Sequence, residues 1–443
     1  MNNILQCHRQ YVIGRSIVLF LLAQIFFLHA FSQSREPNSL AVKIKLFSKD
    51  AIFNSNDSRI GYSVKMKNEI EDNQRGSMNV NVTNDSSVSV FHDNVGIFIT
   101  AKSSFEKYED FDRSKFDPGI YTVSIVINTN HYYDSIKYVI AVEPEKISSV
   151  TFRPSDFQAF WEDGKRELYN IDPQFSVVKK SDLSTQSIDV YYIEFQSVDN
   201  NKSFAWLSIP NQKGKFPVLV KMPEYKAEAK PDYQREFAVM TIGLRSSGNT
   251  EHLISEINSK QRFIYRGIYL DCLRGLDFIY RNTQMRLDTS RVIVSGIGQG
   301  AGIAAAVAAL DGRPKGVLME KPLLLDIPLM YAKSAKKKNY DWPISVFQDY
   351  VNTNHFGVTK DLLLKTWTYF DPVNFSSMIK CPVLAGFSLK NNITPPQCVY
   401  TFMNQLRVLK KEIYTCADCI NDLDRGFYQL QNVWMKEVFR VPL

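Results

Sequence analysis

The segment from Arg291 to Gly300 has the residue order of a turn that exposes a nucleophilic side chain. An apolar run leads into Ser-Gly-Ile-Gly-Gln-Gly at positions 295–300, and the alanine-rich stretch 301–310 follows at once. A strand that enters a sharp glycine turn and leaves as a helix holds its apex residue out for attack on a carbonyl carbon. The residue at this apex is Gly298, which offers no nucleophilic atom.

The segments around this turn alternate between strand-like and helix-like patterns. Short apolar runs typical of strands occupy 216–221, 237–242, 291–295, 315–319 and 382–387. Apolar residues at helical spacing occupy 154–169, 268–280 and 300–310, the first behind a Ser-Asp start signal. This alternation predicts an α/β fold, a mostly parallel sheet with helices on both faces.

The chain before residue 149 has a different pattern. Short alternating β segments are separated by turn formers such as Asp117-Pro118-Gly119, and no helical period is found there. The predicted strands are 41–47, 59–66, 77–82, 88–91, 96–100, 119–127 and 135–142. About seven short strands at this spacing are typical of an immunoglobulin-like β-sandwich. We therefore expect a β-sandwich domain over 33–148 and an α/β domain over 149–443.

From about Arg153 to the C-terminus the chain resembles the carbohydrate esterases of the acetyl xylan esterase and cephalosporin C deacetylase family. The blocks that carry the likeness occur in the family's order, which makes it specific, whereas one turn motif alone would be weak. They are Asp156-Phe-Gln-Ala-Phe-Trp161, Arg266-Gly-Ile-Tyr-Leu-Asp271 with Arg274, Arg291 to Gly300, Tyr369-Phe-Asp-Pro-Val-Asn374, Lys380-Cys-Pro-Val-Leu384 and Pro395-Pro396. The resemblance implies an α/β-hydrolase fold and a Ser-Asp-His triad, with no cofactor and no metal.

Carried over by these motifs, all three triad positions are substituted in this chain. The serine position falls on Gly298. The acid position, four residues before the Pro-Pro pair, falls on Asn391, and the histidine position after the last strand falls on Asn421. Glycine cannot form an acyl intermediate, and asparagine neither relays a proton near neutral pH nor stabilises an imidazolium by charge.

Few residues could replace the missing catalytic side chains. Ser295 lies on the predicted strand three residues before Gly298, where we expect a structural role. His252 and His355 lie in polar loops or helix-rich insertions and are expected at the surface. Asp418 and Asp422 flank Asn421 and are expected to be solvated loop charges, although either could offer a carboxylate.

The resemblance assigns the two oxyanion donors, which are backbone N–H groups, to Tyr225 and Gln299. Any side chain permits such donors, so substitution need not remove them. The family's usual His-Gly before this tyrosine is Pro223-Glu224 here, which leaves the path of the loop in doubt.

The N-terminus reads as a signal peptide over residues 1–32. Arg15 precedes an apolar run over 17–28, and Ala30-Phe31-Ser32 fits a cleavage site. We therefore expect a secreted or periplasmic protein without a lipoprotein anchor or a membrane span. Export permits disulfides, and Cys416 with Cys419 is expected as a disulfide or as two inert thiols in an exposed loop.

Composition narrows the function classes. The net charge of +7 is mild for 443 residues. Nucleic-acid binding would require basic residues gathered on one element, and the only dense run, Lys333 with Lys336, Lys337 and Lys338, is expected to be a solvated loop. Our interpretation is an exported acetyl xylan esterase-like pseudoenzyme that binds acetylated oligo- or polysaccharide or a partner. The alternatives are an active O-deacetylase that uses non-standard groups and a structural module acting through the sandwich. Family members often form rings, so the resemblance leaves a homo-oligomer open.

Overall fold

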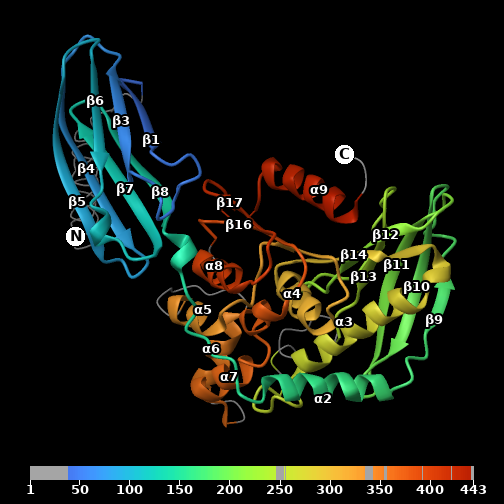
Figure 1. Cartoon of the computed structure of the whole chain (residues 1–443). Coiled ribbons are helices and arrows are strands. Elements are labelled where there is room, and N and C mark those ends of the chain that lie inside the picture. The colour runs from blue at the N-terminus through green and yellow to red at the C-terminus, as the bar shows by residue number, and fades with distance from the viewer. Residues whose placement is uncertain are drawn as a thin grey trace, which may run out of the picture.

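A computed structural model of the chain has a β-sheet part followed by an α/β part (Figure 1). It describes residues 38–245, 254, 256–334, 343–353, 357–391, 393–420 and 422–440. The expected signal peptide lies outside these residues. Within them, no helix has both the length and the apolar character that crossing a membrane requires.

Two mainly antiparallel sheets make up the N-terminal part. One sheet has the order β1-β3-β6, and the other has the order β2-β8-β7-β4-β5. Their strands are β1 Leu40–Leu46, β2 Ile52–Phe53, β3 Gly61–Asn68, β4 Gln74–Asn84, β5 Ser89–Ile99, β6 Ser104–Asp110, β7 Gly119–Thr129 and β8 Tyr133–Val142.

Aromatic side chains join the two sheets. The ring of Phe111, just after β6, lies 5.8 Å from that of Tyr62 in β3 and 4.8 Å from that of Phe91 in β5. Alternate residues of β3 and β4 are buried, as expected where one face of a sheet is covered. The immunoglobulin-like identity of this part stays a prediction.

Two of the predicted β segments were wrong in detail. Segments 88–91 and 96–100 form the single strand β5, because residues 92–95 continue the antiparallel ladder with β4. The edge strand β6 was missed, since its sequence is mostly charged and exposed or half-buried rather than alternately apolar. A polar edge strand of this kind protects a sheet from pairing with other chains.

The α/β part is built on one nine-stranded mixed sheet of order β17-β16-β15-β14-β12-β13-β11-β10-β9. Its strands are β9 Ser176–Lys179, β10 Ile188–Gln196, β11 Lys202–Pro210, β12 Phe216–Lys221, β13 Ala238–Ile242, β14 Leu287–Ile297, β15 Gly316–Glu320, β16 Val383–Ser388 and β17 Lys411–Cys416. Its helices are α2 Phe157–Asn170, α3 Ile264–Arg281, α4 Gln299–Asp311, α5 Ile327–Ser334, α6 Ile344–Asn352, α7 Lys360–Trp367, α8 Pro396–Gln405 and α9 Arg425–Phe439.

Six neighbouring strands pair in parallel, in the order β13, β12, β14, β15, β16 and β17. At one end of the sheet, β9, β10 and β11 pair antiparallel. The predicted parallel α/β sheet is therefore confirmed, and its antiparallel end was not foreseen. Helices cover both faces. Val292 and Val294 of β14 pack in the cluster that contains α3 and α4, while Ile293 packs with Trp434 of α9.

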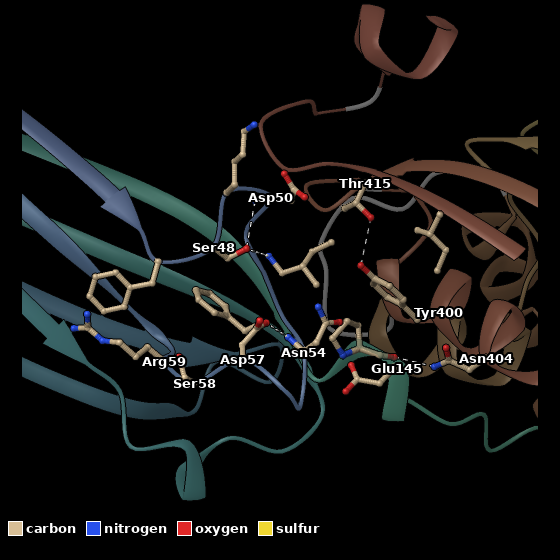
Figure 2. Close-up of a pocket in the computed structure, with 16 residues that line it drawn as sticks. Ser48, Asp50, Asn54, Asp57, Ser58, Arg59, Glu145, Tyr400, Asn404 and Thr415 are labelled. Carbon is tan, nitrogen blue, oxygen red and sulfur yellow. Dashed lines mark hydrogen bonds between the residues drawn. The ribbon is translucent and has the colours of Figure 1, made fainter. Parts of the chain in front are cut away.

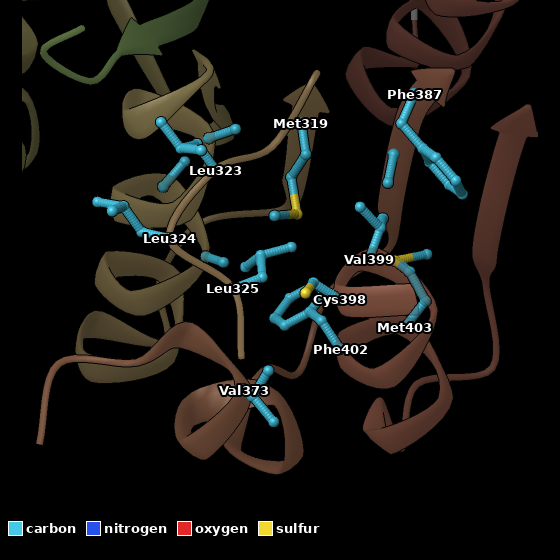
Figure 3. Packing of buried hydrophobic residues seen from close by; sticks show 14 of the residues in the cluster. Met319, Leu323, Leu324, Leu325, Val373, Phe387, Cys398, Val399, Phe402 and Met403 are labelled. Carbon is cyan, nitrogen blue, oxygen red and sulfur yellow. The ribbon is translucent and has the colours of Figure 1, made fainter. Parts of the chain in front are cut away.

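The face beneath α4 carries the larger core. Figure 3 shows Met319 of β15 beside the segment Leu323–Leu325, and Phe387 of β16 on the side of α8. The Phe387 ring lies 5.2 Å from that of Tyr400 in α8. α4 itself is almost wholly buried over Gln299–Leu310, which explains its small side chains: alanine and glycine let the helix lie close to the sheet. This packing fixes the N-terminus of α4 relative to the end of β14.

Candidate functional site

Gly298 occupies the turn between β14 and α4. Its φ of 54° and ψ of −118° lie in a region that residues with a side chain rarely adopt. Its N–H donates to the Glu320 carbonyl at 2.9 Å, and its carbonyl accepts from the Leu323 N–H at 2.9 Å. Two neighbouring chain segments therefore hold the turn in place without help from a side chain.

The three glycines of the turn have different reasons to be glycine. A Cβ at Gly296 would lie 2.1 Å from the carbonyl carbon of Gly300, and a Cβ at Gly300 would lie 2.8 Å from the Met222 carbonyl oxygen. Those two positions exclude a side chain. A Cβ at Gly298 would meet no atom within 4 Å, so space for a side chain remains at the apex.

A buried contact holds the side chain of Gln299, one of the two proposed oxyanion residues. The Tyr265 hydroxyl donates to the Gln299 side-chain oxygen at 2.7 Å, and both residues are fully buried. Burial raises the pKa of Tyr265 well above its ordinary value, and the phenols of Tyr269 and Tyr225 add to the shift. Tyr265 therefore fixes the side chain of the first residue of α4.

Asn391, the acid-position residue, uses its side chain within its own loop after β16. Its amide oxygen accepts from the N–H groups of Ile393 at 2.8 Å and Thr394 at 3.0 Å. This is an Asx turn, which Asp forms equally well. The side-chain oxygen therefore serves the backbone of its own loop.

Asn421 lies outside the described residues, but both of its neighbours are described. Asp422 forms an ion pair at 2.9 Å with Lys321, the residue after β15, and Asp418 forms one at 3.3 Å with Lys390 in the Asn391 loop. The two aspartates are 88% and 90% exposed, as expected for solvated loop charges. These pairs draw the loop after β17 toward the ends of β15 and β16.

Cys416 and Cys419 form a disulfide within this loop, the first of the two expected alternatives. The expectation of an exposed loop was wrong for Cys416, which closes β17 and is 6% exposed in the cluster beneath α9. The Ser388 hydroxyl also donates to the Cys419 carbonyl. Both sulfurs are used in the disulfide, so neither is a free metal ligand.

Ser295 lies on β14 and not at the turn. Its side chain is on the α9 face of the sheet, opposite α4, and is 6% exposed. His252 and His355 lie outside the described residues. The described residues thus place no histidine beside Gly298, since His92 and His131 belong to the N-terminal sheets.

Comparison with known families matches residues 143–434, more than half of the chain, to the acetyl xylan esterase family AXE1. The chain belongs to the acetyl xylan esterase family. The match begins where the β-sheet part ends and includes the turn at Gly298 and the loops after β16 and β17.

Individual relatives of this family are distant. The chain is 22% identical over 304 residues to the acetyl esterase Axe7A of Xylanibacter ruminicola. The alignment covers 62% of this chain. The chain in turn spans 65% of that relative's length.

Solved esterase structures share the fold. Acetyl xylan esterase 1 from Thermoanaerobacterium sp. JW/SL YS485 superposes with a TM-score of 0.61 at 22% identity, over 67% of this chain and 98% of that one. The acetyl xylan esterase from Paenibacillus sp. R4 superposes with a TM-score of 0.59 at 23% identity over the same shares. The predicted α/β-hydrolase fold of the larger domain is therefore confirmed.

Two cavities flank this acetyl xylan esterase-like domain. One, of 720 Å³, lies between the loop after β1 and the hydrolase elements α8 and β17, as Figure 2 shows with Ser48 on one side and Tyr400 and Thr415 on the other. Several of its polar groups already bond to nearby backbone. The Glu145 carboxylate accepts from the Ser55 N–H at 2.8 Å, and the Asn404 amide donates to the Pro144 carbonyl at 2.8 Å.

The second cavity, of 350 Å³, lies beside the turn on the α9 face and includes Glu224 and Ser295. Burial raises the pKa of Glu224 above its ordinary value, and Lys321 opposes that shift. Sequence reasoning noted Glu224 only as a departure from the family and missed Tyr265, Lys321 and Lys390. Tyr265 stands next to the family-like block that begins at Arg266, and this position was the available signal. The sequence gave no signal for the two lysines.

Proposed function

We propose that this chain is an acetyl xylan esterase-family protein without esterase activity that binds acetylated carbohydrate. The observation that carries the proposal is Gly298 at the apex of the turn, since the family's reaction needs a nucleophilic oxygen there. In other hydrolases, removal of triad members lowers turnover roughly 10⁴- to 10⁶-fold. The substitutions at Asn391 and Asn421 remove the acid and the base as well.

The parts that bind an acyl group do not depend on the triad. The first N–H groups of α4 have no partner within the helix and are suited to a carbonyl oxygen. The buried Tyr265–Gln299 contact holds the residue whose N–H is assigned as a donor. The empty space above Gly298 leaves room for an acetyl group where the serine side chain would stand.

The expected ligand is an acetylated oligo- or polysaccharide, which this protein would meet outside the cytoplasm if residues 1–32 direct its export. The family membership supports the carbohydrate, and the disulfide between Cys416 and Cys419 supports an oxidising compartment. The alternative is an active deacetylase with unfamiliar catalytic groups.

One titration with two readouts separates these functions. Acetylated xylo-oligosaccharide is titrated into the purified protein by calorimetry, and free acetate is measured in the same solution. We expect saturable binding that is lost with the deacetylated oligosaccharide, and no acetate above the protein-free blank. Equal binding of both sugars would contradict the acetyl-binding role, and enzymatic acetate release would establish the deacetylase.

A further inference from the structure

The cavity on the α9 face results from an unusual crossover. β12 and β13 are parallel neighbours, a connection that usually contains a helix packed on the sheet. Here residues 222–237 make the crossover without a helix. This loop and α9 cover the sheet incompletely, and the 350 Å³ space between them, here termed the crossover cavity, remains.

The floor of the crossover cavity is one row of sheet residues. Lys221 of β12 pairs with Ser295 of β14, and Ser295 pairs with Leu318 of β15, so the three side chains stand on the same face. Ser295 is 94% buried, lines the cavity, and has no hydrogen-bond partner in the described part of the chain. The Ser295 hydroxyl is therefore available to a molecule in the cavity.

Two further acceptors at the cavity have no donor among the described residues. The side-chain oxygen of Gln431 in α9 is buried and has no partner among the described residues. The half-buried Glu224 carboxylate makes no hydrogen bond or ion pair with a described residue. Glu320 accepts from the Tyr428 hydroxyl at 3.0 Å and lies 4.0 Å from the Lys321 ammonium. The two ammonium groups at this end of the cavity already have closer carboxylate partners, since Lys221 is bound to Asp232 and Lys321 to Asp422.

The charge of the lining favours a cation. Five carboxylates and one ammonium, that of Lys221, line the cavity; the carboxylates belong to Glu224, Glu228, Asp232, Glu236 and Glu320. Lysines pair with three of them, Lys221 with Asp232, Lys230 with Glu228 and Lys321 with Glu320, which leaves Glu224 and Glu236 without an ion pair among the described residues. Phe237 and Met435 add apolar surface. A cavity of this size, with a few convergent polar groups on an apolar wall, is at the lower end of small-molecule sites.

We propose that the crossover cavity binds a small protonated amine that also carries hydroxyl groups, which is the chemistry of an amino sugar. The ammonium supplies three donors for Glu224 and Glu320, and the hydroxyls pair with the Gln431 oxygen and the Ser295 hydroxyl. The proposed function places an acetyl group at Gly298, whereas Ser295 and Gln431 place this site on the α9 face of the sheet; the two sites share only the loop that carries Glu224. The proposal therefore goes beyond the proposed function and does not depend on it.

The test is calorimetric titration of the whole mature protein with D-glucosamine, using D-glucose and N-acetyl-D-glucosamine as neutral matches. We expect glucosamine to bind at least tenfold more tightly than either match. Glu224→Gln and Ser295→Ala should each weaken glucosamine binding several-fold or more. The matched control Glu194→Gln, an exposed carboxylate on β10 outside the cavity, should leave it unchanged.

Two outcomes would overturn the proposal. Glucose bound as tightly as glucosamine would remove the role of the ammonium, and absence of saturable glucosamine binding would remove the site. Thermal melts show whether each variant is folded. If Glu224→Gln were misfolded, protection of the wild-type crossover loop by glucosamine in hydrogen exchange would decide between the same two results.

Discussion

Gly298 is the residue on which the proposed loss of catalysis rests. It stands at the apex of a turn held by backbone contacts to Glu320 and Leu323 and flanked by two glycines that admit no side chain. Glycine adopts the apex conformation without the strain that a serine there would bear. Under our proposal, glycine at this position removes strain and leaves the fold intact.

Restoring the three triad residues together should restore weak esterase activity. We predict that Gly298→Ser, Asn391→Asp and Asn421→His in combination hydrolyse an acetyl ester at least tenfold faster than any single variant. Triad members act as a unit, so single restorations should stay at background. The new Cβ at position 298 has free space and costs about 1–3 kcal/mol of backbone strain.

A further change in the loop after β12 separates the effect of that loop on the rate from the effect of the triad. Changing Pro223-Glu224 to His-Gly in the triple variant should raise the rate again, because a carboxylate at 224 opposes a developing oxyanion. A folded triple variant that stays at background with either loop would contradict the assignment of Asn391 and Asn421.

A second residue-scale prediction concerns two buried carboxylates beneath α4. Burial and the neighbouring Asp326 carboxylate raise the pKa of Asp371 to about 7. The unfolded chain holds this proton less tightly, since an ordinary Asp has a pKa of about 3.9. The stabilising contribution of protonated Asp371 is therefore complete below about pH 4 and is lost as the pH rises through about 7.

Asp326→Asn should reduce the loss of folding stability that occurs as the pH rises through about 7. The substitution removes the adjacent charge, and Asn tolerates the φ of 50° found there. At pH 8 the variant should gain about 1 kcal/mol or more in unfolding free energy over wild type, and at pH 4 the difference should be small. Urea denaturation at both pH values measures it; a variant destabilised equally at both would contradict the coupling.

At the scale of elements, the sequence located most of the hydrolase framework. The predicted strand 216–221 has the bounds of β12, and the turn at Gly298 stands between a strand and a helix as expected. The antiparallel strands β10 and β11 were missed because half-exposed aromatic residues such as Tyr192 and Trp206 alternate there without a continuous apolar run.

The surroundings of the site were less predictable for a physical reason. The pair Lys321–Asp422 joins residues 101 positions apart, and neither residue type signals a partner. The crossover cavity exists because residues 222–237 form no helix. No sequence motif indicates that a helix is absent from a connection. Motifs gave the triad-equivalent positions, while long-range contacts needed coordinates.

The disulfide-bonded loop provides an element-scale prediction. Cys416→Ser with Cys419→Ser should lower Tm by about 2–6 °C, because a disulfide that closes so short a loop restricts the unfolded chain by only about 2 kcal/mol. Reduction of the wild type should give a similar shift, and the reductant should not change the variant. A loss of more than about 8 °C would make this disulfide essential to the fold.

At the scale of the whole molecule, α8 connects the two parts of the chain. It packs against the segment after β8 and against β7. Asn404 at its end donates to the carbonyls of Pro144 and Ile147 at 2.8 and 2.9 Å. A second connection comes from Asp85, in the turn between β4 and β5, which accepts from Lys333 and from Gln397.

Asp85→Ala should loosen this junction without unfolding either part. We predict a larger radius of gyration by X-ray scattering and a change in Tm of no more than about 2 °C, since exposed or half-exposed ion pairs add about 0–1 kcal/mol. Asp110→Ala is the matched control, because its partner Arg59, two residues before β3, belongs to the same N-terminal part. Identical scattering from both variants would mean that α8 alone holds the parts together.

The central claim is that an acetyl xylan esterase fold persists here without the esterase reaction. The most direct measurement is the rate of acetate release from acetylated xylan and from a small acetyl ester by the purified protein. The account predicts the same rate as a variant with Ser295, His252 and His355 all changed to alanine, and no labelling by a serine-directed phosphonate. Acetate release that exceeds this variant, with stoichiometric phosphonate on a serine, would contradict it.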